Sequence, residues 1–174
     1  RPITDAMPKP LVRIGGRTLL DRGLDSRAAA GVTRAVVNVH YLPDQIIDHV
    51  AGRTAPRSLV SDERDRLLDS AGGIVKALPV LGAAPFFILN ADTFWLDRDE
   101  PNLAALARLW DPAQMDILLM MVDPADTVGH SGATDYRLGE DGRLTRAKGA
   151  PDGLVYAGAG IVQPSLFAGA TAEP

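Results

Sequence analysis

Runs of β-branched and aromatic residues alternate with helix-like segments along most of the chain. Thr18 is a suitable N-cap for a first helix, Pro43 suits the first turn of a second, and Asn102 is expected to cap a later one. The pattern predicts strands at 33–39, 58–61, 86–89 and 116–122, and helices at 19–30, 43–50, 74–81 and 102–110. This alternation predicts an α/β fold, a three-layer, mostly parallel, Rossmann-like sheet.

The final third of the chain has a different pattern. Short strands at 136–138 and 143–145 flank the turn residues Gly139-Glu140-Asp141-Gly142, which is typical of a β-hairpin. A further strand is expected at 155–162, interrupted by two glycines. We find no internal repeat or low-complexity linker, so we expect residues 1–174 to form a single domain with a small β-hairpin extension.

Composition narrows the class of protein. The 174 residues are 46% hydrophobic and carry a formal net charge of −4, which excludes a disordered chain and argues against a nucleic-acid binder. Apolar runs such as 117–122 are far shorter than the roughly 20 residues of a membrane span, and no secretory signal is visible. We therefore expect a cytoplasmic protein that binds neither nucleic acid nor membrane.

The chain has no cysteine, which limits the metal chemistry open to it. Disulfides, thiolate zinc sites and thiol nucleophiles are excluded. Any metal would be held by oxygen atoms or by the three histidines. His40, His49 and His130 show no metal-ligand spacing, so we interpret them as surface or packing residues. A hard cation on carboxylates is the remaining option.

Asn90-Ala91-Asp92 directly follows the apolar strand expected at 86–89. Ligands of open parallel sheets bind beyond the carboxyl ends of strands. A carboxylate at this place could hold Mg²⁺ against nucleotide phosphates. Equally, Asp92 could cap the next turn, as Asp often does after a strand.

Two further segments carry candidate chemistry. In Met7-Pro8-Lys9-Pro10, two prolines stiffen the backbone around one lysine. The lysine could then bind an anionic oxygen with little loss of conformational entropy. In Leu68-Asp69-Ser70-Ala71-Gly72-Gly73, small residues ahead of a helix could bring backbone N–H groups close to a flat or anionic ligand. The alternatives are a solvated loop lysine and a tight turn.

A sugar pocket is a weaker possibility. Asp135-Tyr136 and Tyr156-Ala157-Gly158 offer a carboxylate, an aromatic face and bare backbone, which suit hydroxyl and acetamido groups. The same residues could equally be structural parts of the hairpin region. Spacing alone leaves both interpretations open.

The opening segment Arg1-Pro2-Ile3-Thr4-Asp5-Ala6-Met7-Pro8-Lys9-Pro10-Leu11-Val12 resembles the start of the sugar-1-phosphate nucleotidyltransferases. The segments at 68–73 and 90–92 occur in the same order and at fitting distances, so the resemblance covers nearly the whole chain. Residues 68–79 and Asp135-Tyr136-Arg137-Leu138 look most like the bacterial N-acetylmuramate 1-phosphate uridylyltransferases of peptidoglycan recycling. Mannose, glucose and heptose 1-phosphate enzymes share the general pattern.

The resemblance implies roles for particular residues. Lys9 would contact the nucleotide phosphates and Asp92 would hold Mg²⁺, and both would be catalytic. The nucleotide would be bound by Arg1, Lys9, Asp69, Ser70, Gly72 and Asn90, and the sugar by Asn90, Asp135, Tyr156 and Gly158. The family's glycine-rich loop would immediately precede Arg1, and a second metal-binding Asp would follow Pro174, so we expect this chain to lack both segments.

The resemblance also implies a reaction. A nucleotidyl group would pass from an NTP, by expectation UTP, to a sugar 1-phosphate, and pyrophosphate would leave. The enzyme would act as a monomer or a homodimer. The alternatives are a transferase for another sugar 1-phosphate, a non-catalytic sugar-nucleotide-binding regulatory protein on the same fold, and a plain structural α/β domain.

Overall fold

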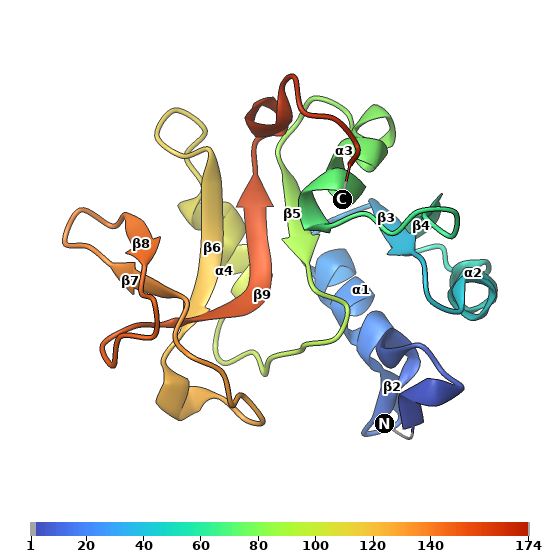
Figure 1. Ribbon diagram of the computed structural model, residues 1–174, viewed down its shortest axis with the longest axis horizontal. Helices are drawn as coiled ribbons and strands as arrows, with labels where there is room; N and C mark the ends of the chain where they lie inside the picture. Colours follow the sequence, from blue (N-terminus) through green and yellow to red (C-terminus); the bar gives the residue numbers. More distant parts are fainter. Residues whose placement is uncertain (1–2, 174) are drawn as a thin grey trace.

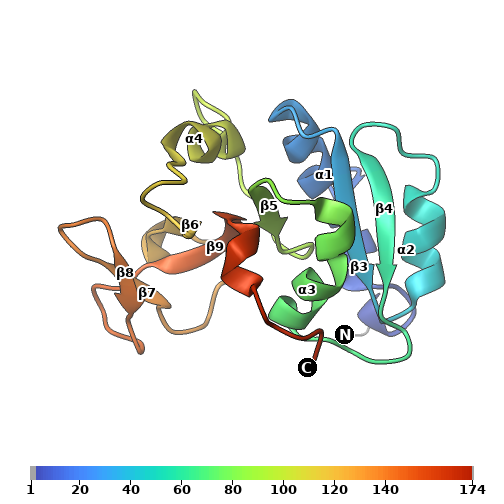
Figure 2. The same ribbon diagram turned by 90° about the horizontal axis from the view of Figure 1, so that it is seen from above.

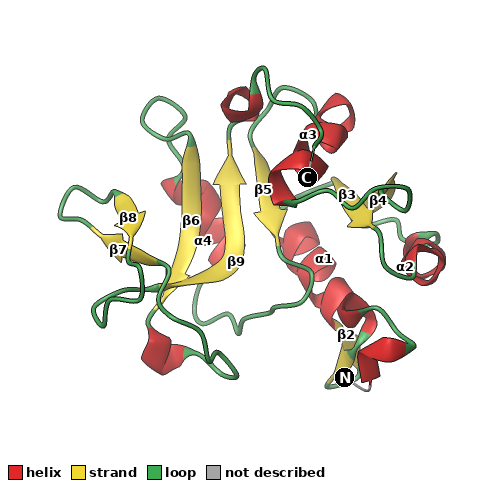
Figure 3. Cartoon of the chain, in the orientation of Figure 1, coloured by secondary structure: helices red, strands yellow, loops and turns green. Residues whose placement is uncertain are grey.

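The structure is a computed structural model that describes residues 3–173 of the chain, with helices and strands alternating along it (Figures 1 and 3). The strands are β1 (Arg13–Ile14), β2 (Arg17–Thr18), β3 (Arg34–Val39), β4 (Arg57–Asp62), β5 (Phe86–Leu89), β6 (Ile117–Val122), β7 (Tyr136–Leu138), β8 (Leu144–Arg146) and β9 (Val155–Val162). The α-helices are α1 (Leu19–Ala29), α2 (Pro43–Val50), α3 (Ser70–Leu81) and α4 (Asn102–Leu109). Short 3-10 helices are η1 (Ile3–Asp5), η2 (Lys9–Leu11), η3 (Pro124–Asp126) and η4 (Pro164–Phe167). Within residues 3–173, we find no helix with the length and hydropathy needed to cross a membrane.

The strands β3 and β4 form a parallel pair with helices on both faces (Figure 2). Side chains of a strand alternate between its two faces. Every second residue of β3 therefore points to one side, where α1 and α2 bury it in a core of Leu20, Leu24, Ala35, Val37, Val39, Ile46 and Val50. On the other face, the Asn38 amide donates to the Gly73 carbonyl of α3 at 3.1 Å. This part of the molecule has the three layers expected from the sequence.

The second sheet has the order β5-β9-β6, with the long strand β9 in the middle and antiparallel to both neighbours (Figure 1). β5 and β6 therefore run in the same direction, and the crossover through α4 joins them. β9 instead follows the β7–β8 hairpin, and a chain that returns without a crossover helix pairs antiparallel. The α/β fold expected from the sequence is confirmed. The sheet was expected to be mostly parallel, but both pairings here are antiparallel because β9 lies between β5 and β6, and among the described strands only β3 and β4 pair in parallel.

A second core joins α4 to this sheet. Leu103 and Leu106 of α4 are buried against Ala159 and Ile161 of β9. Phe87, Leu89, Leu118 and Met120 of the neighbouring strands pack around them. α4 thus packs against the middle strand of the sheet.

Two helix starts differ from the sequence prediction. α3 begins at Ser70 rather than at residue 74, so that Gly72 and Gly73 lie inside the helix. Asp69 is the N-cap, and its carboxylate oxygen accepts the Gly72 N–H at 2.8 Å. Asn102 is the first residue of α4 and not its cap, and its N–H donates to Asp97 Oδ1 at 2.9 Å. In contrast, the predicted cap Thr18 accepts the Asp21 N–H at 3.0 Å.

Candidate active site

The structure brings Lys9 and Asp92 together, although 83 residues separate them in the chain. Lys9 Nζ donates to Asp92 Oδ2 at 2.7 Å. Pro8, next to the lysine, is fully buried and anchors the segment that presents it. The lysine side chain is 60% exposed and the aspartate 40% exposed, so both charges face solvent. An exposed pair of this kind stabilises the fold little and is free to exchange its partner for a ligand.

Gly158 holds the turn after β5 against β9. The Asn90 N–H donates to the Gly158 carbonyl at 2.8 Å. Gly158 has a φ of +81°, and a Cβ atom there would lie 2.5 Å from Thr93 Oγ1. The partners of β6 shift at this place, because Leu119 is opposite Gly160 and Met121 is opposite Tyr156. At this irregular pairing, the backbone of Gly158 packs directly against Asn90, two residues before Asp92.

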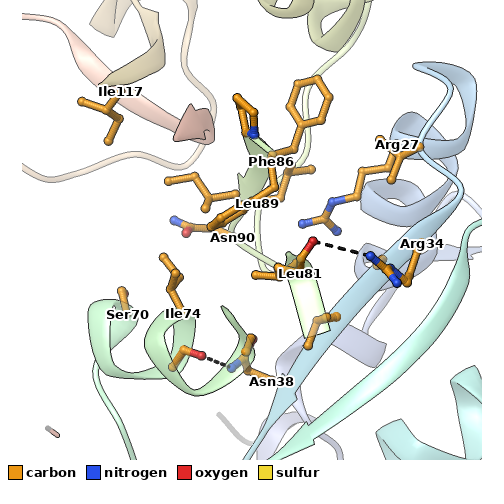
Figure 4. Close-up of a pocket in the computed structure, with 18 of the residues that line it drawn as sticks. Arg27, Arg34, Asn38, Ser70, Ile74, Leu81, Phe86, Leu89, Asn90 and Ile117 are labelled. Atoms are coloured by element: carbon orange, nitrogen blue, oxygen red, sulfur yellow. Dashed lines mark hydrogen bonds between the residues drawn. The ribbon is translucent and has the colours of Figure 1, made fainter. Parts of the chain in front are cut away.

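A cavity of about 800 Å³ lies between α3, β3 and β5 (Figure 4). Each of these two strands pairs with a neighbour on only one side, and their other edges face the cavity. Four of the predicted site residues line it, namely Asp69, Ser70, Asn90 and Tyr156. Of these, Asp69 and Ser70 were expected to bind the nucleotide, Tyr156 the sugar, and Asn90 both.

A buried carboxylate that the sequence analysis missed also lines this cavity. Glu63 is 5% exposed, and its Oε1 accepts the Asn38 amide at 2.6 Å. The same amide also donates to the Gly73 carbonyl, so Asn38 ties β3, the loop after β4 and α3 together. A polar Asn38 within a run of valines was the signal that could have identified this link.

The small residues at the start of α3 were expected to offer backbone N–H groups to a ligand, but in the structure they contact the protein itself. The Gly72 N–H is taken by the Asp69 carboxylate, and the backbone of Glu173 covers Gly72. Asp69 and Ser70 reach the cavity, whereas Gly72 does not line it. The ligand-binding roles of these residues remain predictions.

We expect the Asp69→Ala variant to lose about 1 kcal/mol of unfolding free energy, because the Gly72 N–H loses its acceptor. Asp69→Ser retains a good N-cap and should keep most of the stability. Urea unfolding measures both variants. Equal losses in the two would contradict the capping role of Asp69.

Asp135 connects the hairpin to β9. Its Oδ2 accepts the Tyr156 N–H at 2.9 Å, and its backbone N–H donates to the Leu154 carbonyl at 2.8 Å. Burial raises the pKa of the Tyr156 phenol to about 12, and the nearby Tyr136 adds to this shift. Asp135 therefore has a structural role here, and its expected contact with a sugar remains a prediction.

We expect Tyr156 to ionise near pH 12 in the folded protein, above its ordinary value near 10. A raised pKa means that the folded state resists ionisation, so the resulting stability is complete below about pH 10 and is lost as pH rises through 12. Tyrosinate absorbance compared between the wild type and Tyr156→Phe isolates this titration. A Tyr156 signal that is complete by pH 10 would contradict the burial of the phenol.

The remaining residues considered in the sequence analysis are Arg1, the histidines and the possible metal ligands. Arg1 lies outside the described residues. His49 Nε2 contacts Asp21 Oδ1 at 3.1 Å and His40 Nδ1 contacts the Glu63 carbonyl at 2.7 Å, so both histidines have local partners. Across residues 3–173, no group of three or more His, Cys, Asp or Glu side chains could hold a metal. A cation at Asp92 would therefore complete its shell with ligand or water oxygens.

Comparison with known proteins gives matches over nearly the whole chain. A family model for the MobA-like NTP transferase domain matches residues 4–141. The chain is 40% identical to the N-acetylmuramate alpha-1-phosphate uridylyltransferase of Caulobacter vibrioides and 32% identical to that of Neisseria meningitidis, over 97% of this chain and 72% of each relative. A crystal structure of UDP-glucose pyrophosphorylase with UDP-glucose superposes with a TM-score of 0.72 at 18% identity, covering 96% of this chain and 72% of that one. That structural similarity shows the fold alone.

Proposed function

Because the chain belongs to the MobA-like NTP transferase family, we propose that it transfers a nucleotidyl group from an NTP to a sugar 1-phosphate. The contact between Lys9 and Asp92 carries this proposal. It places an exposed cation beside the carboxylate that follows β5, two residues beyond Asn90, which lines the cavity. Such a pair suits a substrate with several phosphate groups.

The reaction needs positioning more than proton transfer. An oxygen of the sugar phosphate attacks the α-phosphorus of the NTP and forms a new P–O bond, while the bond to the β-phosphate breaks and pyrophosphate leaves. The attacking phosphate is already anionic near neutral pH, so no strong general base is required. The protein must bring like charges together in line and offset the charge that develops on the phosphates.

Lys9 and Asp92 divide this work in our proposal. Lys9 leaves Asp92 Oδ2 and binds phosphate oxygens, which costs little because both side chains are exposed. Asp92 would be the residue that holds Mg²⁺. Mg²⁺ is commonly bound by one or two carboxylates together with substrate phosphates and water, and a single Asp92 fits that pattern. When bound, Mg²⁺ would offset negative charge on the phosphates.

We further propose UTP and N-acetylmuramate 1-phosphate as the substrates, which would place the protein in cytoplasmic recycling of cell-wall sugars. The two relatives with that name match over 97% of the chain, and this supports the choice. Mannose, glucose or heptose 1-phosphate is the alternative acceptor. A non-catalytic regulatory protein that binds sugar nucleotides is the rival from another class, and the paired Lys9 and Asp92 argue against it, because such a protein could lose either residue.

Pyrophosphate release tests the proposal. The protein is incubated with Mg²⁺ and the common NTPs, crossed against N-acetylmuramate, N-acetylglucosamine, glucose and mannose 1-phosphates. We expect the strongest signal with UTP and N-acetylmuramate 1-phosphate, and its loss when EDTA removes the metal. Activity with another combination of NTP and sugar 1-phosphate would keep the proposed reaction and change the proposed substrates. Folded protein that binds a sugar nucleotide by calorimetry without releasing pyrophosphate would favour the regulatory role.

A further inference from the structure

A second hollow, of about 530 Å³, lies beside the β7–β8 hairpin. The loop after η3 forms one wall through His130, Thr134 and Asp135. The end of β8 and the following turn form the other wall through Arg146 and Lys148. The hollow is separate from the larger cavity, because the two have no lining residue in common.

The polar groups of this hollow leave an excess of positive charge. Asp135 is the one carboxylate among its lining residues, and its Oδ2 accepts the Tyr156 N–H. The Thr134 hydroxyl donates to the Ala150 carbonyl at 2.6 Å. Across residues 3–173, no carboxylate lies within ion-pair distance of Arg146 or Lys148. Both cations are exposed and available to an anion.

Arg146 is held in place by its neighbour across the hairpin. Arg146 and Tyr136 are paired residues of β8 and β7, and the guanidinium carbon lies 4.7 Å from the centre of the Tyr136 ring. This cation–π contact limits the freedom of a long side chain. A guanidinium that is already oriented loses less entropy when it binds a carboxylate through two hydrogen bonds.

The hollow adjoins the place expected to bind the sugar. Asp135 is bonded to the backbone of Tyr156, and Gly158, two residues further along β9, contacts Asn90. Two residues of extended chain span at most about 7 Å. The Tyr136 ring that Arg146 covers lines the larger cavity together with Asn90 and Tyr156, so a sugar bound at that wall would have the hollow beside it.

We propose that Arg146 and Lys148 bind a carboxylate on the acceptor sugar and thereby select an acidic sugar 1-phosphate. This inference rests on the proposed function and deepens it. N-acetylmuramate carries a lactyl ether that ends in a carboxylate, and N-acetylglucosamine is the same ring without it. Two cations that meet the carboxylate favour the acidic sugar, and they remain hydrated and unpaired when the lactyl group is absent.

Steady-state kinetics with the two sugars test the assignment. In Arg146→Gln and Lys148→Gln, we expect KM for N-acetylmuramate 1-phosphate to rise about 10–100-fold, because one charge-assisted contact is lost. The values of KM for UTP and for N-acetylglucosamine 1-phosphate should stay unchanged. Arg143→Gln is the matched control, since Arg143 lies on the same hairpin and faces Asp141 at 3.5 Å. An equal rise for both sugars, a rise for UTP or no change would overturn the proposal.

Calorimetry separates this proposal from the proposed function. Wild-type protein should bind N-acetylmuramate 1-phosphate more tightly than N-acetylglucosamine 1-phosphate. The double variant Arg146→Gln/Lys148→Gln should remove the difference, whether or not turnover occurs. Equal binding of the two sugars by the wild type would refute carboxylate selection. Absence of pyrophosphate release with the selective binding intact would instead refute only the transferase activity.

Discussion

Replacing Asp92 with Asn is expected to lower kcat for Mg²⁺-dependent pyrophosphate release by about 10²–10³-fold. The amide has nearly the same shape and still offers an oxygen to Lys9 Nζ, so the contact observed at 2.7 Å does not depend on the charge for its geometry. The amide lacks the negative charge that would hold Mg²⁺. Because Asp92 is 40% exposed and the pair faces solvent, we expect the melting temperature to be unchanged.

Asp99→Asn is the matched control for this experiment, because Asp99 is an exposed carboxylate in the same connection between β5 and α4. Its turnover should equal that of the wild type. The apparent Mg²⁺ affinity, measured from the dependence of rate on metal concentration, should fall in Asp92→Asn alone. Near-normal turnover of Asp92→Asn would return this residue to the alternative role of capping a turn.

Lys9→Ala is expected to lower kcat/KM for the NTP by about 10²-fold, since a phosphate-binding cation is removed while Asp92 stays in place. Lys9→Arg keeps the charge and should retain more activity. The double variant Lys9→Ala/Asp92→Asn should lose less than the product of the two single losses, because the residues are in contact and act on the same phosphates. Strict additivity of the two losses in free energy would contradict a shared site.

The regular elements of the fold could be predicted because their patterns are local. The apolar run at β5 and the valine-rich run at β3 form strands as expected, and Thr18 caps α1. The sequence pattern predicts the start of α3 four residues too late, because two glycines usually weaken a helix. The Asp69 cap offsets part of that weakness, and Gly72 leaves room for the backbone of Glu173, which is far away in the chain.

The sequence names the residues of the candidate site but does not predict how they are arranged. No local sequence pattern around Lys9 or Asp92 predicts that the two side chains are in contact, although the order of the motifs suggested a shared ligand. The antiparallel direction of β9 depends on the connection that precedes it, and this direction brings Gly158 to Asn90. The link between Asn38 and Glu63 was missed because it joins a strand to a loop 25 residues further along the chain, and no local pattern pairs the two.

Phosphorus NMR of the reaction with UTP and N-acetylmuramate 1-phosphate tests the transfer itself most directly. Transfer predicts one diphosphate product with two coupled phosphorus signals, one from the α-phosphate of UTP and one from the sugar phosphate, together with an equal amount of pyrophosphate. This product should be absent with Asp92→Asn over the same period. Formation of UMP and pyrophosphate without the coupled product would mean hydrolysis rather than transfer, and it would contradict the proposed function.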